Sequence, residues 1–240
     1  MGWPIRVLCY PTGDEECVLR RERILRDAGV VELLSEGPYE IDGFKVLGRG
    51  HSAVVVAALL RSGDVAAAKI LRADSKRDDL MLECSLLKKG IPITPKPLYC
   101  FPELIIMELI RGIPLKMLQR RITDCDTAVL TALKVIGAAH YLDRVGINHK
   151  ELSDPTNHVF ITVDGRVKIL DLETASVGHG CNVCRILSWV IMRSHMLEPC
   201  TEGRKLSIEV LQPQLRRYKG GDRSAILPIM RHLNAIKQNA

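Results

Sequence analysis

The sequence feature that most constrains the fold is a lysine inside an apolar segment. Lys69 lies in VAAAKIL (65–71), which follows AVVVAALL (53–60) and the turn RSGD, so the pattern predicts a β-hairpin with Lys69 in its second strand. A charged side chain in a buried strand is strongly destabilising unless an opposite charge pairs with it. The carboxylate that the next segment offers is Glu83, which falls among the apolar positions of a predicted helix over residues 75–90. A purely structural ion pair is the alternative to a functional one.

The apolar pattern changes near Arg111-Gly112, which predicts an α+β chain of two lobes joined by a hinge. Strand-like segments dominate before this point, and helix-like segments with one hairpin follow it. With 240 residues, of which 47% are hydrophobic, the chain is long enough to bury a core. The predicted parts are a helical N-terminal extension over residues 1–38, a small β-rich N-lobe over 39–110 and a reduced helical C-lobe over 111–240. The apolar spacing of the extension stays helical to Leu34, with a break at Gly29.

The formal net charge of +6 comes from basic residues that are dispersed along the chain. Solvated helix faces are the favoured interpretation, and a basic patch for a polyanionic partner is the alternative. Under that alternative, the run LRRYKGGDR (215–223) is where a ribosomal or other nucleic-acid partner would bind. No stretch of 18 or more apolar residues occurs, so no membrane partner and no membrane-spanning helix are expected.

Eight cysteines occur without a signal-peptide pattern before them, which predicts a cytoplasmic protein with mostly reduced thiols. Proteins of hyperthermophiles are the exception, because internal disulfides occur in them. Cys181 and Cys184 form a lone C-x-x-C, whereas a structural zinc ion takes four ligands, usually from two such pairs. A helix start or a disulfide is therefore favoured over zinc at this position.

Three further short motifs suit phosphate or metal chemistry. Gly48-Arg49-Gly50 joins two predicted strands, and glycines there let backbone amides approach phosphate oxygens. His149-Lys150-Glu151-Leu152 lies in a polar loop after a long apolar helix predicted over 126–146. Asp171-Leu172-Glu173 follows the apolar strand RVKIL, where a carboxylate can hold a metal ion. Each motif alone is weak evidence for such chemistry, whereas their order along the chain is strong evidence.

In this order the motifs resemble those of the protein-kinase-like superfamily over residues 44–173. The segment Gly48-x-Gly50-x-x-Ala53-x-Val55 resembles the glycine-rich loop, and VAAAK resembles the strand whose lysine binds the α- and β-phosphates of ATP. ELIIMELI resembles the hinge strand, with its methionine at the gatekeeper position. The resemblance implies that ATP is held by Gly48, Gly50, Ser52, Val55, Lys69, Glu83, Met107, Glu108 and Ile110.

The same resemblance extends to the catalytic residues. HKEL resembles the catalytic loop and KILDLE the metal-binding segment, which implies catalytic roles for Lys69, Glu151 and Asp171. Asp171 would bind Mg²⁺, with either Asn157 or His158 as the second ligand. Asn157 matches by residue type, and His158 matches by its distance from Asp171 along the chain. If His158 is the second ligand, magnesium binding there is in doubt, because magnesium prefers oxygen ligands.

Two departures from the family pattern are carboxylates. Glu151 stands where the family has its catalytic aspartate, and Glu173 stands where the family has the glycine of D-F-G. The carboxylate of Glu151 can still orient or accept a hydroxyl proton, although its side chain is one methylene longer.

The chain also lacks an A-P-E motif and a long activation segment. In this it is similar to atypical kinases of the RIO type and to small archaeal Ser/Thr kinase-like proteins. The resemblance implies an atypical Ser/Thr protein kinase of low activity that transfers the γ-phosphate of ATP, with Mg²⁺, to a hydroxyl of an unknown protein or of itself. A nucleotide-binding pseudokinase or ATPase scaffold is one alternative. A small-molecule phosphotransferase on the same fold is another.

Overall fold

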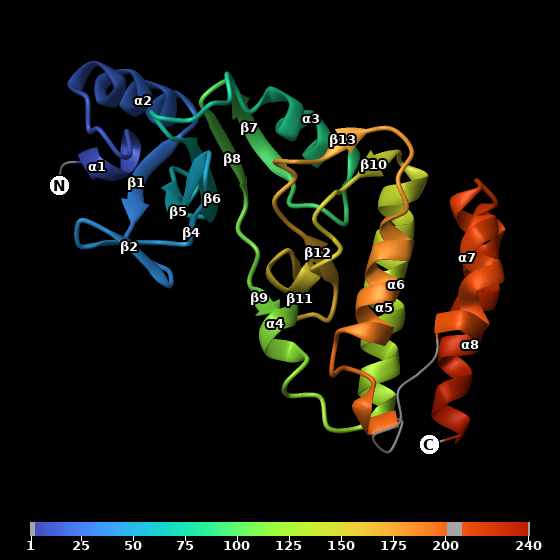
Figure 1. The fold of residues 1–240 in the computed structure, drawn as a ribbon. Helices are drawn as coiled ribbons and strands as arrows, with labels where there is room; N and C mark the ends of the chain where they lie inside the picture. Colours follow the sequence, from blue (N-terminus) through green and yellow to red (C-terminus); the bar gives the residue numbers. More distant parts are fainter. Residues whose placement is uncertain (1–2, 201–207, 240) are drawn as a thin grey trace. The chain divides into compact units, whose positions relative to one another are not determined.

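The computed structural model describes residues 3–200 and 208–239, and it has mixed α and β structure (Figure 1). The α+β class predicted from the sequence is confirmed. Within the described residues, every helix is too short or too polar to cross a membrane. The chain divides into two compact units, the first with Met1–Lys88 and Pro95–Ile110 and the second with Lys89–Thr94 and Arg111–Ala240.

The first unit is built on an antiparallel sheet of six strands. Five of them run in the order β1-β5-β6-β8-β7, while β4 pairs with β5 beside this path. A separate hairpin is formed by β2 and β3. The strands are β1 (Val30–Leu34), β2 (Tyr39–Ile41), β3 (Phe44–Val46), β4 (Gly48–Arg49), β5 (Ala53–Leu60), β6 (Val65–Leu71), β7 (Pro97–Phe101) and β8 (Leu104–Glu108).

The β5–β6 hairpin occupies the middle of this sheet, at the bounds that the sequence pattern predicted. Val55 lies opposite Lys69, and Ala57 lies opposite Ala67. The small and β-branched side chains suit a sheet that is covered on both faces, and most of those in β5 and β6 are buried. The sheet therefore places Lys69 in an apolar interior.

Three helices accompany the sheet: α1 (Ile5–Leu8), α2 (Glu15–Asp27) and α3 (Met81–Lys89). Helix α2 begins at Asp14, whose carboxylate accepts a 2.8 Å hydrogen bond from the backbone amide of Cys17. Leu8 and Leu25 bring α1 and α2 into the same buried core as strands β5, β6 and β8. The first two helices thus belong to the first unit rather than forming a separate part.

Two boundaries in this unit differ from those predicted. Val30–Leu34 is strand β1, not helix, because Gly29 ends α2 with a φ of +79° and the following VVELL pairs with β5. Helix α3 begins at Met81 rather than near Ser75, because the carboxylate of Asp79 accepts the amide of Met81. The hydroxyl of Ser75 instead accepts the amide of Arg77 in a turn.

The second unit is mainly helical and surrounds the long helix α5 (Cys125–Arg144). Helices α6 and α8 pack against α5, and two small sheets, β12-β11-β9 and β10-β13, carry the loops at the site. The other elements are β9 (Gly112–Pro114), α4 (Leu115–Leu118), β10 (Ile147–Asn148), η1 (Pro155–Asn157), β11 (Val159–Thr162), β12 (Val167–Ile169), β13 (Ser176–Val177), α6 (Asn182–Met192), η2 (Glu198–Cys200), η3 (Ile208–Leu211), α7 (Gln212–Lys219), η4 (Arg223–Ala225), α8 (Ile226–Ala235) and η5 (Ile236–Asn239).

A buried polar group holds the helices of this unit together. The carboxylate of Asp143 in α5 accepts hydrogen bonds from the amides of Asn182 and Val183, at 2.9 and 3.1 Å, and from the hydroxyl of Tyr218 at 3.1 Å. Burial raises the pKa of Asp143 despite these donors. The side chain of Asn182 in turn accepts the amide of His149 and donates to the carbonyl of Ile147, so α6 holds the start of the predicted catalytic loop.

The prediction of mostly reduced cysteines is wrong. All eight cysteines are paired, and each pair lies within one unit. The fold brings the two Cα atoms of every pair to between 4.7 and 6.2 Å, the range a disulfide requires, and that proximity is not visible in the spacing along the chain. The pairs are Cys9–Cys17, Cys84–Cys100, Cys125–Cys200 and Cys181–Cys184, the last being the C-x-x-C for which a disulfide was favoured over zinc.

Candidate functional site

The predicted phosphate loop is a tight turn between β4 and β5. Gly48 lies opposite Val55, and the amide of Gly50 donates a 2.9 Å hydrogen bond to the carbonyl of Ala53. A Cβ atom at Gly50 would lie 3.3 Å from that carbonyl oxygen, which is a close contact that glycine avoids. Ser52 is buried, and its hydroxyl has no hydrogen-bond partner among the described residues. The loop thus has an unsatisfied buried hydroxyl beside a glycine turn.

The lysine predicted to need an anion has one. The Lys69 ammonium donates a 2.6 Å hydrogen bond to Glu83 Oε1, and the two side chains are 6% and 2% exposed. Register explains the pairing: the β-sheet buries Lys69 between β5 and β8, and α3 presents Glu83 from its first turn. Arg77 approaches the other oxygen, with Nη1 3.5 Å from Oε2 of Glu83. One buried carboxylate therefore contacts two cations.

The predicted hinge residues lie at the end of β8. Met107 is half-buried and lies opposite Ala67 in the sheet, while Ile110 is the last residue of the first unit. Glu108 makes a two-way contact with Lys96: its amide donates to the Lys96 carbonyl at 2.8 Å, and its carboxylate accepts the Lys96 amide at 3.1 Å. The side chain of Glu108 is therefore used to fix the β7–β8 edge.

In the second unit, three predicted residues converge. Glu151, His158 and Asp171 each offer one ligand atom, and these atoms all lie within 4.8 Å of one another. The β11–β12 pairing produces this arrangement, because the amide of Leu170 donates to the carbonyl of His158 at 2.8 Å and so places Asp171 next to His158. Asp171 itself has a φ of +63°, a conformation that few residues other than glycine adopt and that is concentrated at functional sites.

The group fits a divalent cation. Glu151 Oε2 and His158 Nδ1 are buried and have no hydrogen-bond partner among the described residues, a state that is costly for both atoms unless an ion or water satisfies them. Two ligand atoms on opposite sides of one ion at about 2.1 Å would be about 4.2 Å apart. The three ligand atoms here all lie within 4.8 Å of one another, so small shifts of the side chains would bring them around one ion. Two carboxylates suit magnesium or manganese, and the imidazole shifts the preference towards manganese.

The neighbouring His149 orients this region without taking part in the group. Its side chain is fully buried, its Nε2 lies 3.1 Å from the Leu170 carbonyl, and its ring lies edge-on to the ring of His158. Burial lowers the pKa of His149 to about 4, so the imidazole is neutral at neutral pH. Its Nε2–H then donates to Leu170, which ties the loop after β10 to the residue before Asp171.

The two candidates for the second metal ligand differ in the structure. His158 belongs to the converging group, whereas Asn157 is exposed at the end of η1. Glu173 is half-buried and lies outside that group.

Some side chains near these residues were not singled out from the sequence. Arg77 is the clearest, because its contact with Glu83 depends on a turn before α3 that the sequence pattern placed inside the helix. Its only sequence signal was an arginine six positions before a buried glutamate, which is common on solvated helices. Tyr10, from the N-terminal segment, is another and is treated below.

Comparison with known proteins adds no family assignment. A scan against protein-family models finds no match to this chain, and a search of curated proteins finds none either.

Proposed function

We propose that the chain is an ATP-dependent phosphotransferase of the protein-kinase-like type, and that its two units correspond to the two lobes of that fold. The observation that carries the proposal is the convergence of Glu151, His158 and Asp171. Glu151 and His158 each have a buried side-chain atom with no hydrogen-bond partner among the described residues. Convergent carboxylates of this kind are what phosphoryl transfer uses to hold a metal ion against ATP. The Lys69–Glu83 pair in the first unit supports the same proposal.

Lys69 would bind the phosphates of ATP, with Glu83 holding it in place. A lysine fully neutralised by its glutamate would attract a phosphate weakly, but here Arg77 shares Glu83. Two cationic side chains at one carboxylate favour a polyanion. The glycine turn and the buried Ser52 hydroxyl would receive phosphate oxygens from the same unit.

Glu151, His158 and Asp171 would hold the divalent cation in the second unit. The cation, when bound, supplies positive charge that stabilises the charge on the transferred phosphoryl group. The acceptor hydroxyl oxygen forms a bond to the γ-phosphorus as the bond from that phosphorus to the β-phosphate oxygen breaks. The hydroxyl proton passes to a carboxylate oxygen of Glu151, and ADP leaves.

The acceptor proposed is a Ser or Thr hydroxyl of a protein, including this one. A second candidate, a small-molecule hydroxyl, is favoured by the short connection between Asp171 and α6, which pairs β13 with β10 and leaves no long segment to dock a peptide. A nucleotide-binding scaffold with little transfer is the third, because Glu151 replaces the usual aspartate.

The test is phosphoryl transfer from γ-labelled ATP in the presence of Mg²⁺ or Mn²⁺. The purified chain is incubated alone, with a general protein substrate, and with a metabolite extract, beside Lys69→Met and Asp171→Asn variants. We expect label on the chain or on the protein substrate, lost by at least about 100-fold in both variants.

The outcomes of these incubations distinguish the protein kinase, the small-molecule phosphotransferase and the nucleotide-binding scaffold. Label that appears only with the metabolite extract favours a small-molecule acceptor. Metal-dependent ATP binding without transfer or hydrolysis favours the scaffold and contradicts the transferase. Label that persists in both variants shows that these residues do not form the site.

A further inference from the structure

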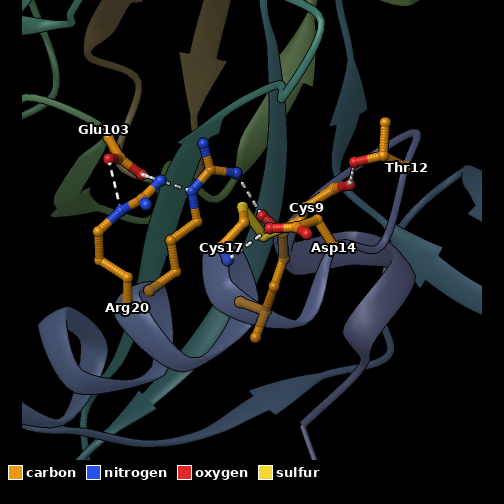
Figure 2. Close-up of polar contacts among 8 residues, drawn as sticks. Cys9, Thr12, Asp14, Cys17, Arg20 and Glu103 are labelled. Atoms are coloured by element: carbon orange, nitrogen blue, oxygen red, sulfur yellow. Dashed lines mark hydrogen bonds and ion pairs between the residues drawn. A yellow bond between two sulfur atoms is a disulfide. The ribbon is translucent and has the colours of Figure 1, made fainter.

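The N-terminal segment contains a closed loop that the sequence left without a role. Cys9 and Cys17 are joined by a disulfide, which closes the residues between α1 and the first turn of α2 (Figure 2). Inside the loop, the hydroxyl of Thr12 donates to the Cys9 carbonyl at 3.3 Å, and Asp14 caps the helix at the Cys17 amide. Tyr10 therefore projects from a segment whose two ends are fixed.

Two arginines of α2 anchor this segment to the sheet. Arg21 is only 4% exposed and donates to the carbonyl of Leu8 and to Glu103, which lies between β7 and β8. Arg20 donates to the same carboxylate (Figure 2). Burial acts to raise the pKa of Glu103, but the hydrogen bonds from Arg21 and Arg20 outweigh it and hold that pKa below its ordinary value. The anchor is therefore charged at neutral pH.

Tyr10 makes contact with the glycine turn and the end of β6. The guanidinium groups of Arg49 and Arg72 both lie over its ring, with Cζ atoms 5.3 and 4.8 Å from the ring centroid. The Tyr10 carbonyl accepts a 2.8 Å hydrogen bond from the amide of Ala73. Tyr10 is half-buried, so one side chain of the anchored segment reaches Arg49 in β4 and Arg72 directly after β6.

Arg72 extends this contact into the turn itself. Its Nη1 donates to the carbonyl of Gly50 at 3.1 Å, and its backbone amide donates to the carbonyl of Ser52 at 2.7 Å. Asp74 fixes the rest of the guanidinium group through two hydrogen bonds of 2.8 and 2.7 Å. A chain of contacts therefore runs from the disulfide-closed loop through Tyr10 and Arg72 to the turn that contains Gly50.

We infer that Tyr10 is a positioning residue for this glycine turn, holding residues 48–52 in the conformation that receives the phosphates of the nucleotide. That the turn receives a nucleotide rests on the proposed function. The contact of Tyr10 with the turn is seen in the structure itself. Arg49 and Arg72 connect the turn to the Tyr10 ring, and these contacts limit the motion of the turn.

The test compares Tyr10→Leu with Tyr10→Phe. Phenylalanine keeps the aromatic face that attracts the two guanidinium groups, while leucine keeps apolar bulk and removes that face. Affinity for ATP with Mg²⁺ and for adenosine is measured for the full chain and both variants. We expect Tyr10→Leu to weaken ATP binding about fivefold and adenosine binding less than twofold, and Tyr10→Phe to match the unchanged chain. Equal loss for both ligands, or no loss in Tyr10→Leu, overturns the inference.

Amide hydrogen exchange of residues 48–52 without nucleotide gives a readout independent of the proposed function. Exchange is expected to be faster in Tyr10→Leu and unchanged in Tyr10→Phe, and equal exchange in all three proteins contradicts the role of Tyr10. If the unchanged chain binds no ATP, the proposed function fails, and the exchange result alone decides whether Tyr10 holds the turn. If Tyr10→Leu does not fold, Arg49→Gln removes one cation from an exposed side chain, and the same exchange comparison is made.

Discussion

Replacing Glu83 by leucine is expected to lower the free energy of unfolding by about 3–5 kcal/mol, because it removes the carboxylate from a buried ion pair with Lys69. Lys69 is 6% exposed in its side chain and lies between two strands, so it cannot regain water by a change of rotamer alone. Arg77, with a 23% exposed side chain, is closer to solvent and contributes less to the loss. Urea unfolding at neutral pH measures the change.

The matched control replaces both partners. In the double variant Lys69→Met with Glu83→Leu, two apolar side chains of similar length occupy the same space, and removal of both charges is often neutral or stabilising. We expect the double variant to recover most of the stability lost in Glu83→Leu, which a double-mutant cycle reports as a large coupling between the two sites. A double variant as unstable as Glu83→Leu would show that packing, and not the broken ion pair, accounts for the cost.

Replacing Asp171 by asparagine is expected to weaken divalent-cation binding by at least about 100-fold. Loss of a residue that only supports a metal ligand already costs 10–100-fold, and Asp171 is proposed as a ligand itself. The asparagine also removes one negative charge from a group whose other carboxylate is Glu151. Titration of the protein with Mn²⁺, followed by the spin-resonance signal of the free ion, gives the affinity.

Glu173→Gln provides the control for that charge. It removes a carboxylate two positions along the chain and outside the converging group, so we expect a change of less than about twofold. His158→Ala and Asn157→Ala extend the comparison, with a loss of binding expected only for His158→Ala. Equal losses in Asp171→Asn and Glu173→Gln would mean that the ion responds to general negative charge and has no defined ligands.

Local sequence patterns predicted the parts of the fold that depend on neighbours in the chain. The β5–β6 hairpin, the long helix α5 and the β11–β12 hairpin follow from apolar spacing and turn residues, and the need of Lys69 for an anion follows from its apolar strand. The pairing with Glu83 could be predicted because α3 comes next in the sequence and Glu83 lies on its apolar side.

Features set by long-range contacts were not predictable in this way. Val30–Leu34 is a strand because β5 is available to pair with it, although its apolar spacing alone favoured helix. The disulfide between Cys125 and Cys200 joins residues 75 positions apart, and the contacts of Tyr10 join the chain start to β4 and β6. Which of Asn157 and His158 lies nearer Asp171 depends on the register of β11 against β12, which the sequence alone does not give.

The most direct test of the account is the affinity of the intact chain for ATP, measured by calorimetry with and without Mg²⁺ or Mn²⁺. We expect binding that a divalent cation strengthens at least about tenfold, and that Lys69→Met weakens by at least about the same factor. ATP binding that is absent under all these conditions, or that neither the cation nor Lys69→Met alters, would contradict it.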